Sequence, residues 1–103
     1  MQNRDKINPE YYHRCNIECK DLIKAYLGTP GYIFFCKGNV LKYVFRHQGK
    51  NGVEDLKKAA RYIEMAKEVM PSLDEQIMEL TELVEKYGKA YSYKPEIDED
   101  YTE

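Results

Sequence analysis

The strongest constraint on the fold of this chain is the spacing of its apolar residues, which recur three and four positions apart in four segments. Residues at that spacing share one face of an α-helix, so each segment can bury an apolar stripe. Helix-breaking residues separate the segments: "GTPG" at 28–31, "GKNG" at 49–52 and Pro71. We therefore predict an all-α fold, a compact bundle of about four helices with short connections. The helices are expected at about 16–27, 32–47, 52–70 and 73–87.

The segment 32–47, "YIFFCKGNVLKYVFRH", is rich in β-formers, but its periodicity favours a helix over a strand. Gly38 inside this helix costs about 1 kcal/mol relative to alanine, which suggests that a neighbouring backbone or a ligand approaches closely there. The apolar side of the helix, expected to face inward, carries Val40, Leu41, Val44 and Phe45. The opposite side carries Asn39, Lys42, Tyr43 and Arg46.

Local signals predict where the last two helices begin and end. Glu54 and Asp55 suit the positive end of a helix dipole in the first turn of the third helix. Ser72, with Glu75 three residues later, forms a capping-box pattern that would start the fourth helix, and Gly88 would end it.

Charge is concentrated in two parts of a chain whose net charge is only −2. Residues 37–63 carry seven Lys and Arg against two acids, and the last nine residues, "PEIDEDYTE", carry five acids and no base. Such an acidic end is typical of disordered tails. With 103 residues the chain is long enough for one modest core. We predict a single helical domain over 1–94 and an acidic, disordered tail over 95–103.

Several features predict a cytoplasmic protein. No apolar run approaches the roughly 18 residues that a membrane span needs, and the first residues lack the apolar stretch of a secretory signal. The three cysteines are an odd number without a CxxC pair, which favours reduced thiols. A zinc site from His13, Cys15 and Cys19 is disfavoured, because the spacing is unlike established zinc motifs and no fourth ligand is evident.

The basic stripe in the middle of the chain is the leading candidate for a functional site. Lys42 and Arg46 lie one helical turn apart on the same face, with Tyr43 beside them. Cationic side chains bind phosphate oxygens, amides read polar edges, and a tyrosine ring stacks on a base. The P-loop pattern does not occur in the sequence. The candidate ligand-binding residues are Asn39, Lys42, Tyr43, Arg46, Lys50, Asn51, Lys57 and Lys58.

Two other interpretations of the charged residues remain open. The stripe can be an ordinary solvated face, with Tyr43 half-buried and the cations paired to Glu54, Asp55 or the acidic fourth helix. Helix carboxylates can also hold Mg²⁺ near phosphates. The candidates for that role are Glu64 and Glu68, and Glu79, Glu82 and Glu85. Because the last three lie opposite the apolar stripe, we expect no metal site there and a need for Mg²⁺ only if the protein is catalytic.

The stretches "NPEYY…NIEC" and "GNVLKYVFRHQGKNGVEDLKKAARYIE" resemble a family of small phage-encoded domains of unknown function, commonly labelled phage nucleotide kinases, which lack a P-loop. The resemblance covers about residues 8–66 and includes GN-x-x-KY-x-x-R, then K-N-G-x-E-D-L-K-K-A, then Tyr62. The sequence departs from the family where Tyr11-Tyr12 stands in place of the usual His-Tyr.

The resemblance implies a nucleotide ligand, in the cytoplasm of an infected bacterial host. We expect a small phage-type nucleotide-binding protein, like a nucleoside monophosphate kinase if it is an enzyme, with catalytic residues unassigned. One alternative is a non-catalytic oligomer that sequesters nucleotide or cyclic nucleotide signals of host defence. Another is a protein-interaction module. Duplex nucleic acid and membranes are not expected as partners. Self-association is expected, because a chain this short has little room for an enclosed nucleotide pocket.

Overall fold

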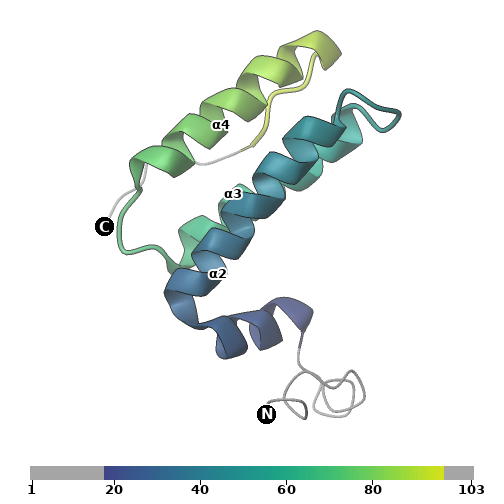
Figure 1. Cartoon of the computed structure of the whole chain (residues 1–103). Helices are drawn as coiled ribbons and strands as arrows, with labels where there is room; N and C mark the ends of the chain where they lie inside the picture. Colours follow the sequence, from purple (N-terminus) through teal and green to yellow (C-terminus); the bar gives the residue numbers. More distant parts are fainter. Residues whose placement is uncertain (1–17, 97–103) are drawn as a thin grey trace. The chain divides into compact units, whose positions relative to one another are not determined.

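The computed structural model describes residues 18–96, which form three α-helices and one short 3₁₀-helix and contain no strand (Figure 1). The helices are α2 (Cys19–Arg46), α3 (Val53–Val69) and α4 (Glu75–Gly88), and the 3₁₀-helix is η2 (Lys89–Tyr91). The all-α prediction is therefore confirmed for this part of the chain. No helix in this range combines the length and the apolar character that crossing a membrane requires.

By its internal contacts the chain separates into two units, residues 1–32 and 33–103. In the first unit α2 is interrupted at Gly28, whose φ of 78° and ψ of 167° are not helical. The predicted break is thus confirmed, but only Gly28 leaves the helix, and the four expected helices become three. Pro30 does not stop the helix, because it lies in the first turn after the break, where its missing N–H has no intrahelical partner to lose.

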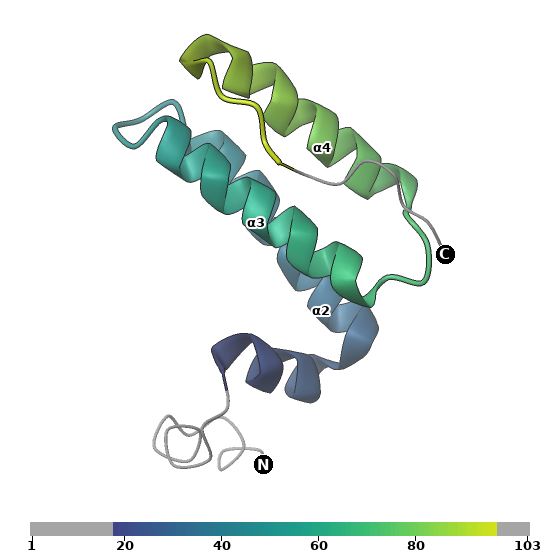
Figure 2. The same cartoon turned by 180° about the vertical axis from the view of Figure 1, so that it is seen from behind.

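In the second unit α3 and α4 run side by side in both views (Figures 1 and 2), and the rest of α2 contacts both of them. The Phe35 ring on α2 meets the Tyr62 ring on α3 edge to face, with centroids 6.0 Å apart. The core of this unit consists of Cys36, Val40, Val44, Leu56, Ala59, Ala60, Ile63, Met65, Ala66, Met70, Ile77, Leu80 and Val84.

The inward side of α2 is narrower than the sequence predicts. Val40 and Val44 are buried, but Leu41 is 54% exposed and Phe45 is 77% exposed, so their predicted inward orientation is wrong. The buried apolar residues Cys36, Val40 and Val44 follow a four-residue spacing, and Leu41 and Phe45 lie about 100° further round the helix. Phe34 is also exposed. We call Phe34, Leu41 and Phe45 the exposed apolar stripe.

Gly38 lies within the length of this stripe. A Cβ atom built there has nothing within 4 Å, so the described residues do not supply the close neighbour that its sequence position suggests. Its helical position therefore has no explanation in the packing of residues 18–96.

The predicted ends of α3 are confirmed, whereas the predicted start of α4 is wrong. Gly52 precedes α3 and Met70 follows it. The N-cap of α4 is Asp74, whose carboxylate accepts a hydrogen bond of 2.8 Å from the Ile77 N–H, and not Ser72. Gly88 ends α4 as expected, and a Cβ there would meet the Tyr93 carbonyl oxygen at 2.5 Å.

The chain after η2 turns back toward α3 in both views (Figures 1 and 2). Pro95, the first residue of the predicted tail, is buried, and Glu96 is exposed. The rest of that predicted tail, together with His13 and Cys15, lies outside the described residues.

Candidate functional site

The Tyr43 ring on α2 is surrounded by three cations. Lys42 Nζ lies 4.7 Å from the ring centroid, Arg46 Cζ lies 5.4 Å from it, and Lys58 Nζ reaches it from α3 at 5.5 Å. The ring also stacks on Tyr62, with centroids 6.0 Å apart and an interplanar angle of 15°. We call Lys42, Tyr43, Arg46 and Lys58 the cation cluster. A cation over an aromatic face gains about 0.5–1 kcal/mol at an exposed site, which offsets part of the repulsion between like charges.

The three cations of the cluster are exposed to solvent, and Tyr43 is half-buried. In residues 18–96 no carboxylate lies within ion-pair distance of Lys42, Arg46 or Lys58. The predicted pairing of cations with carboxylates does occur elsewhere, because Lys37 pairs with Asp74 and Lys57 pairs with Glu54. The cluster therefore presents positive charge that the described part of the chain does not neutralise.

A cavity of about 510 Å³ adjoins the cluster at the turn between α2 and α3. It is lined by Phe45, Arg46, Gln48, Gly49, Lys50, Asn51 and Asp55. Arg46 thus belongs to both the cluster and the cavity. Lys50 and Asn51, predicted as ligand-binding residues, lie in the same cavity wall. We call this space the turn cavity.

Asn39 was predicted to present its amide to a ligand, but its Nδ2 donates a hydrogen bond of 3.0 Å to the Phe35 carbonyl oxygen one turn earlier in α2. The side chain is half-buried, and one of its two N–H donors is used within its own helix.

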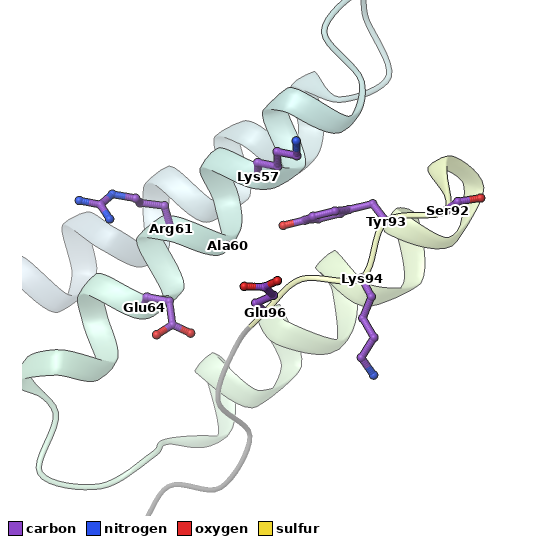
Figure 3. Close-up of a pocket in the computed structure, with 8 residues that line it drawn as sticks. All are labelled: Lys57, Ala60, Arg61, Glu64, Ser92, Tyr93, Lys94 and Glu96. Atoms are coloured by element: carbon purple, nitrogen blue, oxygen red, sulfur yellow. The ribbon is translucent and has the colours of Figure 1, made fainter.

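Lys57 is separated from the other predicted residues because it lines a second cavity, of about 570 Å³ (Figure 3). Its Nζ lies 3.7 Å from the Glu54 carboxylate, while its neighbour Lys58 joins the cation cluster. Successive residues of an α-helix point about 100° apart round its axis, so the adjacent lysines of α3 lie on different surfaces. The second cavity is lined by Lys57, Ala60, Arg61, Glu64, Ser92, Tyr93, Lys94 and Glu96.

Tyr93 reaches toward α3 across this second cavity, whereas the Lys94 amino group points away from it (Figure 3). Burial raises the pKa of the Tyr93 hydroxyl, and the negative charge of Glu96 raises it further. Tyr93 therefore stays protonated and neutral at physiological pH.

His47 follows α2 and is buried between aromatic rings of α4 and η2. Its ring lies 4.9 Å from the Tyr87 ring and 5.9 Å from the Tyr91 ring, centroid to centroid. Nδ1 is 3.1 Å from the Tyr91 hydroxyl, and Nε2 is buried without a hydrogen-bond partner in the described chain. This environment is that of a packed core residue that anchors the turn.

The carboxylates considered for a metal do not form a metal-binding group in the described range. Across residues 18–96 no three His, Cys, Asp or Glu side chains gather closely enough to hold an ion. Glu79 and Glu82 are exposed on α4.

Tyr62 and Asp55 belong to the site but are not among the binding residues predicted from the sequence. Tyr62 supports Tyr43 from α3, and Asp55 is 1% exposed and lines the turn cavity. Both belong to the motif that carries the family resemblance, and this motif is the sequence signal that could have identified them. The sequence pattern places Asp55 in the first turn of the helix, where it suits the dipole, and does not predict its burial.

A family model described as a protein of unknown function, DUF3310, matches residues 6–64, more than half of the chain. A search of the curated proteins and a search of the solved structures each found no match.

Proposed function

The chain belongs to the DUF3310 family of proteins of unknown function, and on this premise we propose that it is a small nucleotide-binding protein. The observation that carries the proposal is the cation cluster, in which Lys42, Arg46 and Lys58 surround Tyr43 without a carboxylate partner in residues 18–96. In our proposal these cations hold the phosphate groups of the ligand. The resemblance of Lys42, Tyr43 and Arg46 to the phage nucleotide kinase motif supports the same assignment.

Phosphate is the anion that this arrangement suits best. A guanidinium donates paired hydrogen bonds to phosphate oxygens, and ammonium groups add point charges that adapt to the ligand. In this proposal Tyr43 takes a different role from the predicted stacking on a base, since its ring stacks on Tyr62 and lies near three cations. We assign it to gathering the cations and not to stacking on a base.

The turn cavity supports a nucleotide over a bare phosphate ion. Its volume of about 510 Å³ lies in the range of small-molecule sites, roughly 300–1,000 Å³. Arg46 lines it and also touches the Tyr43 ring, so a ligand held by its phosphate at the cluster can extend into the cavity.

Isothermal titration calorimetry against a panel of 5′-mononucleotides and cyclic nucleotides tests this proposal. We expect one or more of them to bind and Arg46→Gln to weaken binding at least tenfold, because a charged hydrogen bond contributes about 1.5–3 kcal/mol. Arg61→Gln is the matched control, since it removes the same charge from an arginine of the second cavity. Absence of binding across the panel, or a loss caused by Arg61→Gln and not by Arg46→Gln, would contradict the proposal.

The fate of the bound nucleotide separates two versions of this function. Transfer of phosphate between nucleotides would indicate a nucleoside monophosphate kinase-like enzyme, with Mg²⁺ as its expected cofactor. Recovery of an intact cyclic nucleotide after denaturation would favour a protein that sequesters signals of host defence.

A further inference from the structure

Asp55 combines burial with an unused hydrogen-bond acceptor. It is the third residue of α3, its side chain is 1% exposed, and its Oδ1 is buried without a hydrogen-bond partner in residues 18–96. Buried polar atoms of folded proteins are nearly always hydrogen-bonded, because an unpaired one loses its hydration without replacement. A position in the first turn of a helix favours the carboxylate charge but supplies no partner for Oδ1.

Asp55 is one of the residues that line the turn cavity, together with the cations Arg46 and Lys50. Neither cation forms an ion pair with it within the described chain. The residues that line the cavity thus include two kinds of group: the cations Arg46 and Lys50, and the carboxylate of Asp55.

A ligand that satisfies both must carry an anionic group and an N–H or O–H donor. Inorganic phosphate carries its O–H donors on the anionic group itself, so the carboxylate would repel the charge beside each donor. A nucleotide carries donors on its sugar or base, away from its phosphate. We propose that Asp55 accepts a hydrogen bond from the nucleoside part of the bound nucleotide and thereby selects nucleotides over bare phosphates. This inference rests on the proposed function and adds a specificity-determining residue to it.

The test compares wild type with Asp55→Asn, which preserves the size of the side chain but replaces one acceptor oxygen by a donor. The probes are the mononucleotide that binds wild type most tightly, inorganic phosphate and pyrophosphate. We expect Asp55→Asn to bind the nucleotide about tenfold or more weakly, the range for a hydrogen bond to a charged group. Binding of phosphate and pyrophosphate should be unchanged or tighter, because the repelling charge is gone.

Analogues of the nucleotide identify the donor and keep the test decisive if Asp55→Asn does not fold. A 2′-deoxy form removes a sugar hydroxyl, and a base without its exocyclic amino group removes an N–H donor. One of these analogues should bind wild type about tenfold more weakly, and that difference should shrink in Asp55→Asn. Equal affinity of wild type for the nucleotide and all its analogues would overturn the inference.

Two further results separate this inference from the proposed function. Nucleotide binding that depends on Arg46 but is identical in wild type and Asp55→Asn would refute the role of Asp55 alone. Binding that disappears on chelation of divalent cations and is unchanged by removal of any donor would also refute it. Failure of any nucleotide to bind wild type would refute the proposed function itself.

Discussion

Lys37 on α2 donates a hydrogen bond of 2.6 Å to Asp74, the residue that caps α4. Lys37 is 9% exposed and also donates to the Gln76 side-chain oxygen at 2.9 Å. One buried lysine therefore ties α2 to the first turn of α4. Because Lys37 is paired with Asp74, its charge does not add to the exposed positive charge of the basic segment 37–63.

Asp74→Asn is expected to lower the free energy of unfolding by about 0.2–1 kcal/mol near neutral pH, the range for exposed ion pairs, because Asp74 remains 43% exposed. Burial raises the pKa of the Asp74 carboxyl, but the Lys37 hydrogen bond, the Ile77 N–H and the Lys37 charge together bring it below the ordinary value of 3.8. A carboxyl whose pKa is lowered by folding stabilises the folded state above that ordinary value, and this contribution is lost as the pH falls through the folded pKa.

The difference between wild type and Asp74→Asn should therefore shrink as the pH falls below 3.8. Urea unfolding at a series of pH values measures it. Asp74→Ala, which also removes the cap, should cost about 1 kcal/mol more at every pH. A penalty for Asp74→Asn that is independent of pH would contradict the assigned role of the charge.

Gly52→Ala is expected to destabilise the fold by about 1–3 kcal/mol, the cost of a strained backbone conformation. Gly52 has a φ of 44° and a ψ of −114°, and a Cβ there would lie 3.1 Å from the Tyr91 ring. Gly38→Ala is the matched control, because it fills open space on a helix and should stabilise the chain by about 0.5–1 kcal/mol. Thermal unfolding should show a lower midpoint temperature than wild type for Gly52→Ala and a higher one for Gly38→Ala. Equal effects would mean that the turn before α3 tolerates a side chain.

Tyr43→Leu is expected to weaken nucleotide binding about tenfold, because the cations lose the aromatic face that holds them together. Tyr43→Phe keeps the ring and should bind within about twofold of wild type. Calorimetry with the tightest nucleotide, after a check that both variants fold, makes the comparison. A loss in Tyr43→Phe as large as that in Tyr43→Leu would show that the hydroxyl, not the ring, is the functional group.

Self-association remains a prediction, and it can be tested by substitutions in the exposed apolar stripe. If copies of the chain associate through this stripe, Leu41→Ser with Phe45→Ser should reduce the mass measured by light scattering to that of a monomer. Folding stability should change little, because both side chains are already exposed at 54% and 77%. Met78→Ser, at another exposed apolar residue, should leave the mass unchanged. Wild type that is monomeric at micromolar concentration would contradict the prediction.

Much of the fold could be predicted because its signals are local. Gly28 interrupts α2, Gly52 precedes α3 and Gly88 ends α4, each where a neighbouring pattern of apolar residues changes. The orientation of Leu41 could not be predicted, because two sides of α2 are apolar and only the neighbouring helices decide which one is covered. The four residues of the cation cluster are all among the predicted binding residues, but the sequence did not distinguish Lys58, which joins Tyr43, from Lys57, which lines the second cavity.

Local information in the chain predicts which segments are helical, since backbone hydrogen bonds and apolar spacing act within a few residues. The packing of helices against one another decided the rest: which of Ser72 and Asp74 caps α4, which of Lys57 and Lys58 joins Tyr43, and how deeply Asp55 is buried. Each of these depends on partners remote in the sequence, such as Lys37 for Asp74, and pairings of that kind form only when the helices meet.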